Sequence, residues 1–240
     1  MTFIKTIKLN IKYLLKIISG KYRYLYKDIK LDVKWFGGYY GGFYLFPNVI
    51  KNNAVILSFG IGEDVSFDRA VSDKFGCPVL CFDPTPKSIN WVTNQGSDLI
   101  KNLIFYKYGL AEKTHNAMFF LPKNKDHVSG SIILQEAVDT KDHISVELKS
   151  IGDICSELNI QHIDVLKMDI EGAEYNVLKD LMLSDIFIGQ ILVEFHDRLF
   201  HDVFLKSRES VALLKGRGYI VSAHSKSFEE VSFIHSSLLR

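Results

Sequence analysis

The chain has 240 residues, of which 47% are hydrophobic and 24% charged, and its formal net charge is +1. These values exclude an intrinsically disordered chain and give no bulk attraction for nucleic acid, which we do not expect as a partner. The three cysteines, Cys77, Cys81 and Cys155, are too few for a disulfide framework and indicate a reducing compartment such as the cytoplasm.

Residues 1–34 form a basic segment ahead of a domain that we expect to span residues 35–240. The segment carries nine Lys or Arg against two Asp, a net charge of +7, so the remaining residues carry −6. Apolar residues recur at helical spacing over residues 4–18, with lysines between them. This pattern predicts a basic amphipathic helix that docks on the cytoplasmic face of an inner membrane, peripherally, because no apolar run approaches about 18 residues. The alternative is a surface helix packed on its own domain.

Glycine pairs alternate with aromatic residues between positions 35 and 46. Glycines allow tight turns, and aromatic faces stack on planar or sugar-like ligands. The segment predicts either a lid in which Tyr40 touches the substrate or a plug that covers one edge of a sheet.

From residue 54 onward, short apolar runs alternate with helical patterns. The alternation predicts an α/β sandwich around a mainly parallel, seven-stranded sheet that ends in an antiparallel C-terminal hairpin. The expected sheet strands span 55–59, 79–82, 102–106, 163–168, 190–195, 219–223 and 231–235, the extra strands 117–121 and 144–149, and the helices 64–75, 86–95, 151–158, 173–182 and 207–215.

Ligands of such folds bind beyond the carboxyl ends of the strands, so the residues there are the candidates. After the first sheet strand comes a Gly-x-Gly turn, Gly60 to Gly62, and after the second comes Asp83, which can accept hydrogen bonds from ribose hydroxyls. A dinucleotide-binding site would need a glycine at position 65, where this chain has valine. The acidic residues Glu63 and Asp64 would also repel a pyrophosphate. S-adenosylmethionine carries positive groups instead, so this loop favours it over a nicotinamide dinucleotide.

Four titratable residues follow the fourth and fifth sheet strands: Asp169, Glu171, Glu194 and His196. Such a cluster is costly unless it is paired, hydrated or metal-bound, and it suits a general base or a hard divalent ion. The nearby Glu174 has an equally good explanation as an acidic residue in the first turn of a helix.

The segment 167–174, Lys-Met-Asp-Ile-Glu-Gly-Ala-Glu, resembles the signature of the FkbM-type methyltransferases, bacterial surface-polysaccharide branch. The glycine turn, the Phe-Asp-Pro-Thr-Pro segment at 82–86 and the Val-Glu-Phe-His segment at 193–196 stand in the right order around it. The resemblance covers about residues 37–236 and implies a class I methyltransferase fold, S-adenosylmethionine as donor and O-methylation of a sugar hydroxyl. The acceptor would be a surface polysaccharide or its lipid-linked glycan precursor.

The resemblance also implies roles for individual residues. The candidate donor contacts are Ser58, Gly60, Gly62, Glu63, Asp64, Asp83, Gly109, Leu110 and Asp169. The candidate substrate residues, besides Tyr40, are Glu171, Ser129 and Ser131. The chain departs from the family pattern at two positions. Ser58 stands where an acidic residue usually precedes the first glycine, and Asp64 stands where the family has its third glycine. Glu63 or Asp64 then contacts the donor's amino group; otherwise the chain is a non-catalytic glycan-binding or complex-organising member.

For catalysis, a hydroxyl acceptor needs a base that takes its proton as the new bond forms. His196 is the first candidate and Asp169 the second. A divalent ion held by Asp169 and Glu194 is the alternative, because a bound ion lowers the pKa of a hydroxyl.

Overall fold

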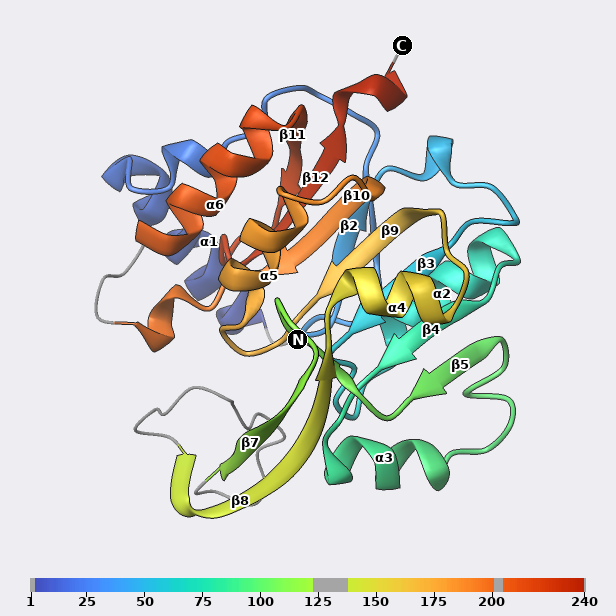
Figure 1. The fold of residues 1–240 in the computed structure, drawn as a ribbon. Coiled ribbons are helices and arrows are strands. Elements are labelled where there is room, and N and C mark those ends of the chain that lie inside the picture. The colour runs from blue at the N-terminus through green and yellow to red at the C-terminus, as the bar shows by residue number, and fades with distance from the viewer. Residues whose placement is uncertain (1–2, 123–137, 201–204, 240) are drawn as a thin grey trace.

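The computed structural model describes residues 3–122, 138–200 and 205–239, with side chains for 10–119, 143–200 and 205–239. A seven-stranded sheet at its centre has the order β11-β12-β10-β9-β3-β4-β5 (Figure 1). Its strands are β3 (Ile56–Phe59), β4 (Val79–Phe82), β5 (Leu103–Tyr106), β9 (His162–Met168), β10 (Phe187–Glu194), β11 (Tyr219–His224) and β12 (Glu230–His235).

Strand β12 runs in the opposite direction to the other strands of this sheet, because it pairs antiparallel with both β10 and β11. The other pairs, from β10 across to β5, are parallel. The C-terminal hairpin thus inserts its second strand between the first and the rest of the sheet. The predicted architecture, a mainly parallel seven-stranded sheet with an antiparallel C-terminal hairpin, is confirmed.

Helices cover both faces of the sheet, and a separate apolar core fills each interface. One core packs the sheet against α4 (Ile151–Glu157), α5 (Glu174–Leu181) and α6 (Leu205–Gly216), which Figure 1 shows in front of the sheet. The other packs it against α2 (Ser66–Phe75) and α3 (Pro86–Thr93). The central strands β3 and β9 are almost completely buried, as parallel strands between two helical layers must be.

A smaller three-stranded sheet stands beside the central one. It has the order β6-β8-β7, with β6 (Gly109–Leu110), β7 (His115–Pro122) and β8 (Val138–Lys149). The two extra strands predicted around a polar loop are therefore confirmed, although both are longer than predicted because the antiparallel pairing of β7 and β8 continues outward, to the pair Pro122 and Val138.

The aromatic-glycine segment folds into a hairpin of β1 (Lys34–Phe36) and β2 (Phe43–Leu45). It covers a face of the sheet and not an edge: the side chain of Gln190, in central strand β10, bonds both the backbone N–H and the carbonyl of Phe46. The side chains of Phe36, Phe43 and Leu45 pack into the core that contains α2. Alternation along each short strand accounts for this, since only one side of the hairpin faces the protein.

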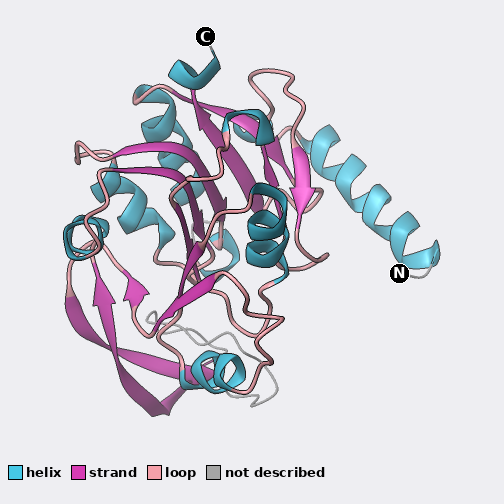
Figure 2. Ribbon diagram, turned by 90° about the vertical axis from the view of Figure 1, so that its right-hand side faces the viewer, coloured by secondary structure: helices cyan, strands magenta, loops and turns pink. Residues whose placement is uncertain are grey.

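The N-terminal segment begins with α1 (Phe3–Ser19), which Figure 2 shows at one end of the molecule. Tyr13 stacks on Phe228, and Lys16 Nζ donates a hydrogen bond to the Ser227 carbonyl at 2.6 Å, so one side of α1 packs on the turn between β11 and β12. Leu25, just after α1, is buried in the main core. In the described parts of the chain, no helix has the length and apolarity needed to cross a bilayer.

Candidate functional site

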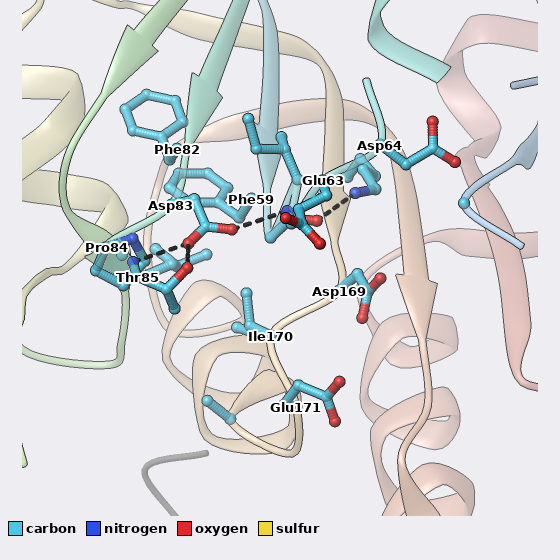
Figure 3. A pocket seen from close by; sticks show the side chains of 18 of the residues that line it. Phe59, Glu63, Asp64, Phe82, Asp83, Pro84, Thr85, Asp169, Ile170 and Glu171 are labelled. Carbon is cyan, nitrogen blue, oxygen red and sulfur yellow. Dashed lines mark hydrogen bonds between the residues drawn. The ribbon is translucent and has the colours of Figure 1, made fainter. Parts of the chain in front are cut away.

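One pocket opens at the carboxyl ends of β3, β4 and β9, the edge at which ligands of such folds bind (Figure 3). Loops after these strands, the hairpin tip and the β6 segment together form its wall. The candidate residues that line it are Gly60, Gly62, Glu63, Asp64, Asp83, Gly109, Leu110, Asp169, Glu171 and Tyr40. The topology therefore brings most of the residues predicted for donor and substrate to one cavity.

The glycine turn after β3 has a conformation that side chains rarely adopt. Gly60 has φ +75° and Gly62 has φ +54°. A Cβ atom on Gly60 would lie 1.7 Å from the backbone oxygen of Asp169, so only hydrogen fits there. The two loops consequently touch through their backbones, and the ligand side of the turn presents peptide groups without side chains.

Asp83 is held at the end of β4 by three hydrogen bonds within the pocket wall (Figure 3). Its Oδ2 accepts from the N–H of Gly62 at 2.9 Å, and its Oδ1 accepts from the N–H and the hydroxyl of Thr85 at 2.9 and 2.7 Å. Two carboxylate oxygens offer about four acceptor sites, so one remains for a ligand hydroxyl. Asp83 thus joins the glycine turn to the loop that follows β4, and its position fits the predicted contact with a ribose.

The acidic residues of the turn, Glu63 and Asp64, line the pocket and differ in their contacts. Glu63 Oε2 lies 3.5 Å from Lys87 Nζ. Asp64 Oδ1 accepts the backbone N–H of Ser66 at 2.8 Å, and its side chain approaches Gly41 in the hairpin tip. Beside it, Tyr40 is 82% exposed and lines the pocket, where a lid residue would lie. The strands of the hairpin cover a face of the sheet, so the predicted plug over a sheet edge is wrong.

Ser58 does not lie where the sequence predicts. It is fully buried inside β3, does not line the pocket, and interacts with Asp68 on α2. Alternation along the strand explains this, because Phe59 and Ser58 point to opposite faces of the sheet and Phe59 takes the pocket side. Ser58 is therefore part of the packing between β3 and α2, and the prediction of a donor contact is corrected.

Asp169 and Glu171 reach the pocket, whereas Glu194 and His196 stand behind them. The Nε2 atom of His196 lies 3.6 Å from Asp169 Oδ1, 3.5 Å from Glu171 Oε2 and 3.5 Å from Glu194 Oε1. Glu171 has φ +52°, a strained conformation for a residue with a side chain. The structure thus brings the four predicted residues together, but only two of them can touch a ligand in the pocket.

Glu174 organises this cluster from beneath. It is completely buried, and its Oε1 accepts the N–H of Ile170 at 3.0 Å and the ring Nδ1–H of His196 at 2.8 Å. Its Oε2 accepts the N–H of Gly172 at 2.9 Å. One carboxylate therefore fixes both the loop that carries Asp169 and Glu171 and the orientation of the imidazole, which goes beyond the first-turn role that the sequence offers.

Burial and mutual repulsion shift the pKa values of the cluster. Burial raises the pKa of Glu194 to about 8, helped by the charge of Asp169, and burial also raises the pKa of Asp169. Burial lowers the pKa of His196, but the nearby Glu174, Asp169 and Glu194 outweigh it and raise that pKa to about 10. His196 is buried and does not line the pocket, whereas Asp169 does, so the geometry disfavours His196 as the base and favours Asp169.

Two further residues of the site were not singled out from the sequence. Lys167 is buried, lines the pocket and donates from Nζ to the Gly60 carbonyl at 2.8 Å, which ties β9 to the glycine turn. Thr85 holds Asp83. For Lys167 the available signal is a lysine between Leu166 and Met168 in a buried strand, because a buried ammonium needs a partner. Ser129 and Ser131 lie outside the described residues.

Comparison with known proteins finds relatives whose names describe methyltransferases. The human "Probable methyltransferase-like protein 24" is 27% identical over 144 residues, which are 59% of this chain and 32% of that protein. The "2-O-methyltransferase NoeI" of Sinorhizobium fredii is 25% identical over 185 residues, 68% of this chain and 72% of that one. A solved structure of "Methyltransferase FkbM from Methylobacillus flagellatus" has 12% identity and a TM-score of 0.45, over 77% of this chain and 44% of that one.

The chain matches about a third of the length of the human relative, at 32%. The family profile described as "Methyltransferase FkbM domain" matches residues 37–221, which include the glycine turn, Asp83 and the acidic cluster. The chain therefore belongs to the methyltransferase FkbM domain family.

Proposed function

We propose that this protein is an S-adenosylmethionine-dependent O-methyltransferase that acts on a sugar hydroxyl of a surface polysaccharide or of its lipid-linked precursor. The observation that carries the proposal is that the glycine turn, the tethered Asp83, Asp169 and Glu171 all line the same pocket. The name of the relative NoeI, a 2-O-methyltransferase, supports transfer to oxygen.

The residues present fit such a donor. Asp83 keeps one acceptor site for a ribose hydroxyl, Gly109 and Leu110 offer an apolar wall for the adenine, and the carboxylates of the turn suit a positive amino group. When bound, S-adenosylmethionine supplies a methyl group on a positive sulfonium, and transfer to a hydroxyl leaves S-adenosylhomocysteine and one proton. Asp169 lines the pocket and is positioned to take that proton, while the exposed Tyr40 offers a ring face to a sugar.

We also propose that α1 docks the protein on the cytoplasmic face of an anionic membrane, where lipid-linked glycans are accessible. Four side chains at helical spacing, Ile11, Leu14, Leu15 and Ile18, are each more than half exposed and form a stripe away from the packed side of α1. Basic residues stand nearby, with Lys12 in the helix and Lys21 and Arg23 just after it, all exposed. Apolar insertion together with basic residues is the combination that binds anionic lipid surfaces.

Calorimetric titration with S-adenosylhomocysteine tests the donor site. We expect micromolar binding by the full chain and at least about a tenfold weaker Kd in Asp83→Asn, because the amide cannot accept all the N–H groups that the carboxylate holds. The matched control is Asp73→Asn, whose carboxylate pairs with Arg69 on the outside of α2. A folded wild-type chain that binds no S-adenosylhomocysteine would contradict the proposal and favour a non-catalytic glycan-binding role.

Vesicle sedimentation tests the docking of α1. The double substitution Leu14→Ser and Leu15→Ser is expected to reduce binding to vesicles that contain phosphatidylserine at least about fivefold, since each exposed leucine contributes buried apolar area. Leu183→Ser is the control, because Leu183 is also exposed, at 80%, but lies outside α1. Equal binding by the α1 variant and the control would refute membrane docking through this stripe.

A further inference from the structure

We propose that the cluster at the pocket is a binding site for a first-row divalent metal ion, with Asp169, Glu171 and His196 as ligands and the carboxylate of Glu194 beside them. The inference deepens the proposed function and rests on it, because the ion would assist the same methyl transfer.

The Nε2 atom of His196 is buried without a hydrogen-bond partner among the described residues. The side chain is only 1% exposed. Three carboxylate oxygens surround it, from Asp169, Glu171 and Glu194, at 3.5–3.6 Å. These distances exceed those of ordinary hydrogen bonds, about 2.7–3.2 Å. A buried ring nitrogen is thus aimed into a space edged by oxygen atoms.

The separations suit atoms that share one ion. Ligand atoms about 2.0–2.2 Å from a metal stand roughly 3.0–3.5 Å apart when they are neighbours in its coordination shell. The candidate ligand atoms of Asp169, Glu171 and His196 all lie within 4.8 Å of one another. Only a modest contraction would bring them onto a common ion.

Glu174 supplies the second requirement of such a site. Histidines that bind metals usually donate their other ring N–H to a carboxylate, which fixes the tautomer and directs the remaining nitrogen at the ion. His196 Nδ1 lies 2.8 Å from Glu174 Oε1, and Glu174 itself is held by the N–H groups of Ile170 and Gly172. The imidazole is therefore oriented before any ion binds.

The donor set selects the class of ion. Three carboxylates attract a dication. The two basic side chains beside them are engaged elsewhere, since Lys167 donates to the Gly60 carbonyl and the half-exposed Arg198 approaches Glu194 at 3.6 Å and also contacts Glu229. An imidazole among oxygen ligands suits Mn²⁺, Fe²⁺ or Zn²⁺ better than Ca²⁺ or Mg²⁺. Because Asp169 and Glu171 line the pocket, an ion here would border the space for the acceptor and lower the pKa of a hydroxyl that binds it.

Titration of chelator-treated full-length protein with Mn²⁺, followed by electron paramagnetic resonance, tests the site without any assay of activity. We expect one Mn²⁺ per chain with micromolar affinity and at least a tenfold loss of affinity in Glu194→Gln. Glu194 does not line the donor pocket, so this variant should keep the wild-type Kd for S-adenosylhomocysteine. Glu229→Gln, which removes a carboxylate that pairs with the same Arg198, is the matched control and should bind Mn²⁺ normally.

Each result decides the question. Wild-type protein that binds S-adenosylhomocysteine but no stoichiometric Mn²⁺ refutes the metal site and leaves the proposed function standing. Mn²⁺ binding that survives both Glu194→Gln and Glu171→Gln also refutes it, since the ion must then lie elsewhere. If the folded wild-type chain does not bind S-adenosylhomocysteine, the proposed function itself fails.

Discussion

Gly60→Ala is expected to abolish detectable binding of S-adenosylhomocysteine and to lower the free energy of unfolding by about 2–5 kcal/mol. The new Cβ would lie 1.7 Å from the Asp169 backbone oxygen, and neither strand end can retreat. Gly60 N–H bonds the Phe82 carbonyl, and the Gly60 carbonyl holds Lys167, so movement of the turn would break both contacts. Urea denaturation and calorimetry on the same preparation measure the two effects.

Gly76→Ala is the matched control for this substitution. Gly76 has φ +69°, close to the φ of Gly60, but a Cβ there would meet no atom within 4 Å. It therefore carries the conformational cost of a left-handed alanine, about 1–2 kcal/mol, without a steric clash. If both variants lose the same stability and both bind S-adenosylhomocysteine, the close contact between the two loops is not what the turn requires.

Glu174→Ala is expected to lower the free energy of unfolding by about 3–5 kcal/mol, because it leaves three hydrogen-bond donors without their acceptor. These donors are the N–H groups of Ile170 and Gly172 and the ring Nδ1–H of His196. The strained Glu171 lies in the loop that they fix, so methyl transfer should fall along with stability. Urea denaturation gives the first quantity, and S-adenosylhomocysteine formation gives the second.

Glu157→Ala separates this effect from the mere loss of a carboxylate. Glu157 forms a 2.6 Å ion pair with Lys149 at the surface, where such pairs contribute about 0–1 kcal/mol. A loss in Glu174→Ala no larger than in Glu157→Ala would show that the acidic loop holds its shape without Glu174.

The fold could be predicted from the sequence because its signals are local. Runs of apolar residues bounded by glycine, such as the run that ends at Gly60, define buried parallel strands, and the strand ends then give the edge where the candidates meet. The pocket assembled from Asp83, Gly109 and Asp169 follows from that topology.

What could not be predicted depends on side-chain direction and on packing between distant segments. Ser58 faces the helical layer because Phe59 takes the pocket side, and a one-residue change of phase decides this. His196 lies behind Asp169 because Glu174, 22 residues away, binds its ring. The position of Glu174 in the first turn of α5 is visible in the sequence, but no local pattern reveals a partner at that distance.

The burial of Leu25 in the main core shows that the N-terminal segment also contributes to the packing of the domain. Tyr24 bonds Ser207 in α6, and Asp28 pairs with Lys215 in the same helix, so the chain ahead of residue 37 supports the C-terminal half of the molecule. The stretch that the family profile matches and the unit that folds cooperatively are therefore different lengths of chain. A chain trimmed to the family boundary would expose an apolar hole beside α6, and any loss of membrane affinity it showed would report unfolding as much as docking.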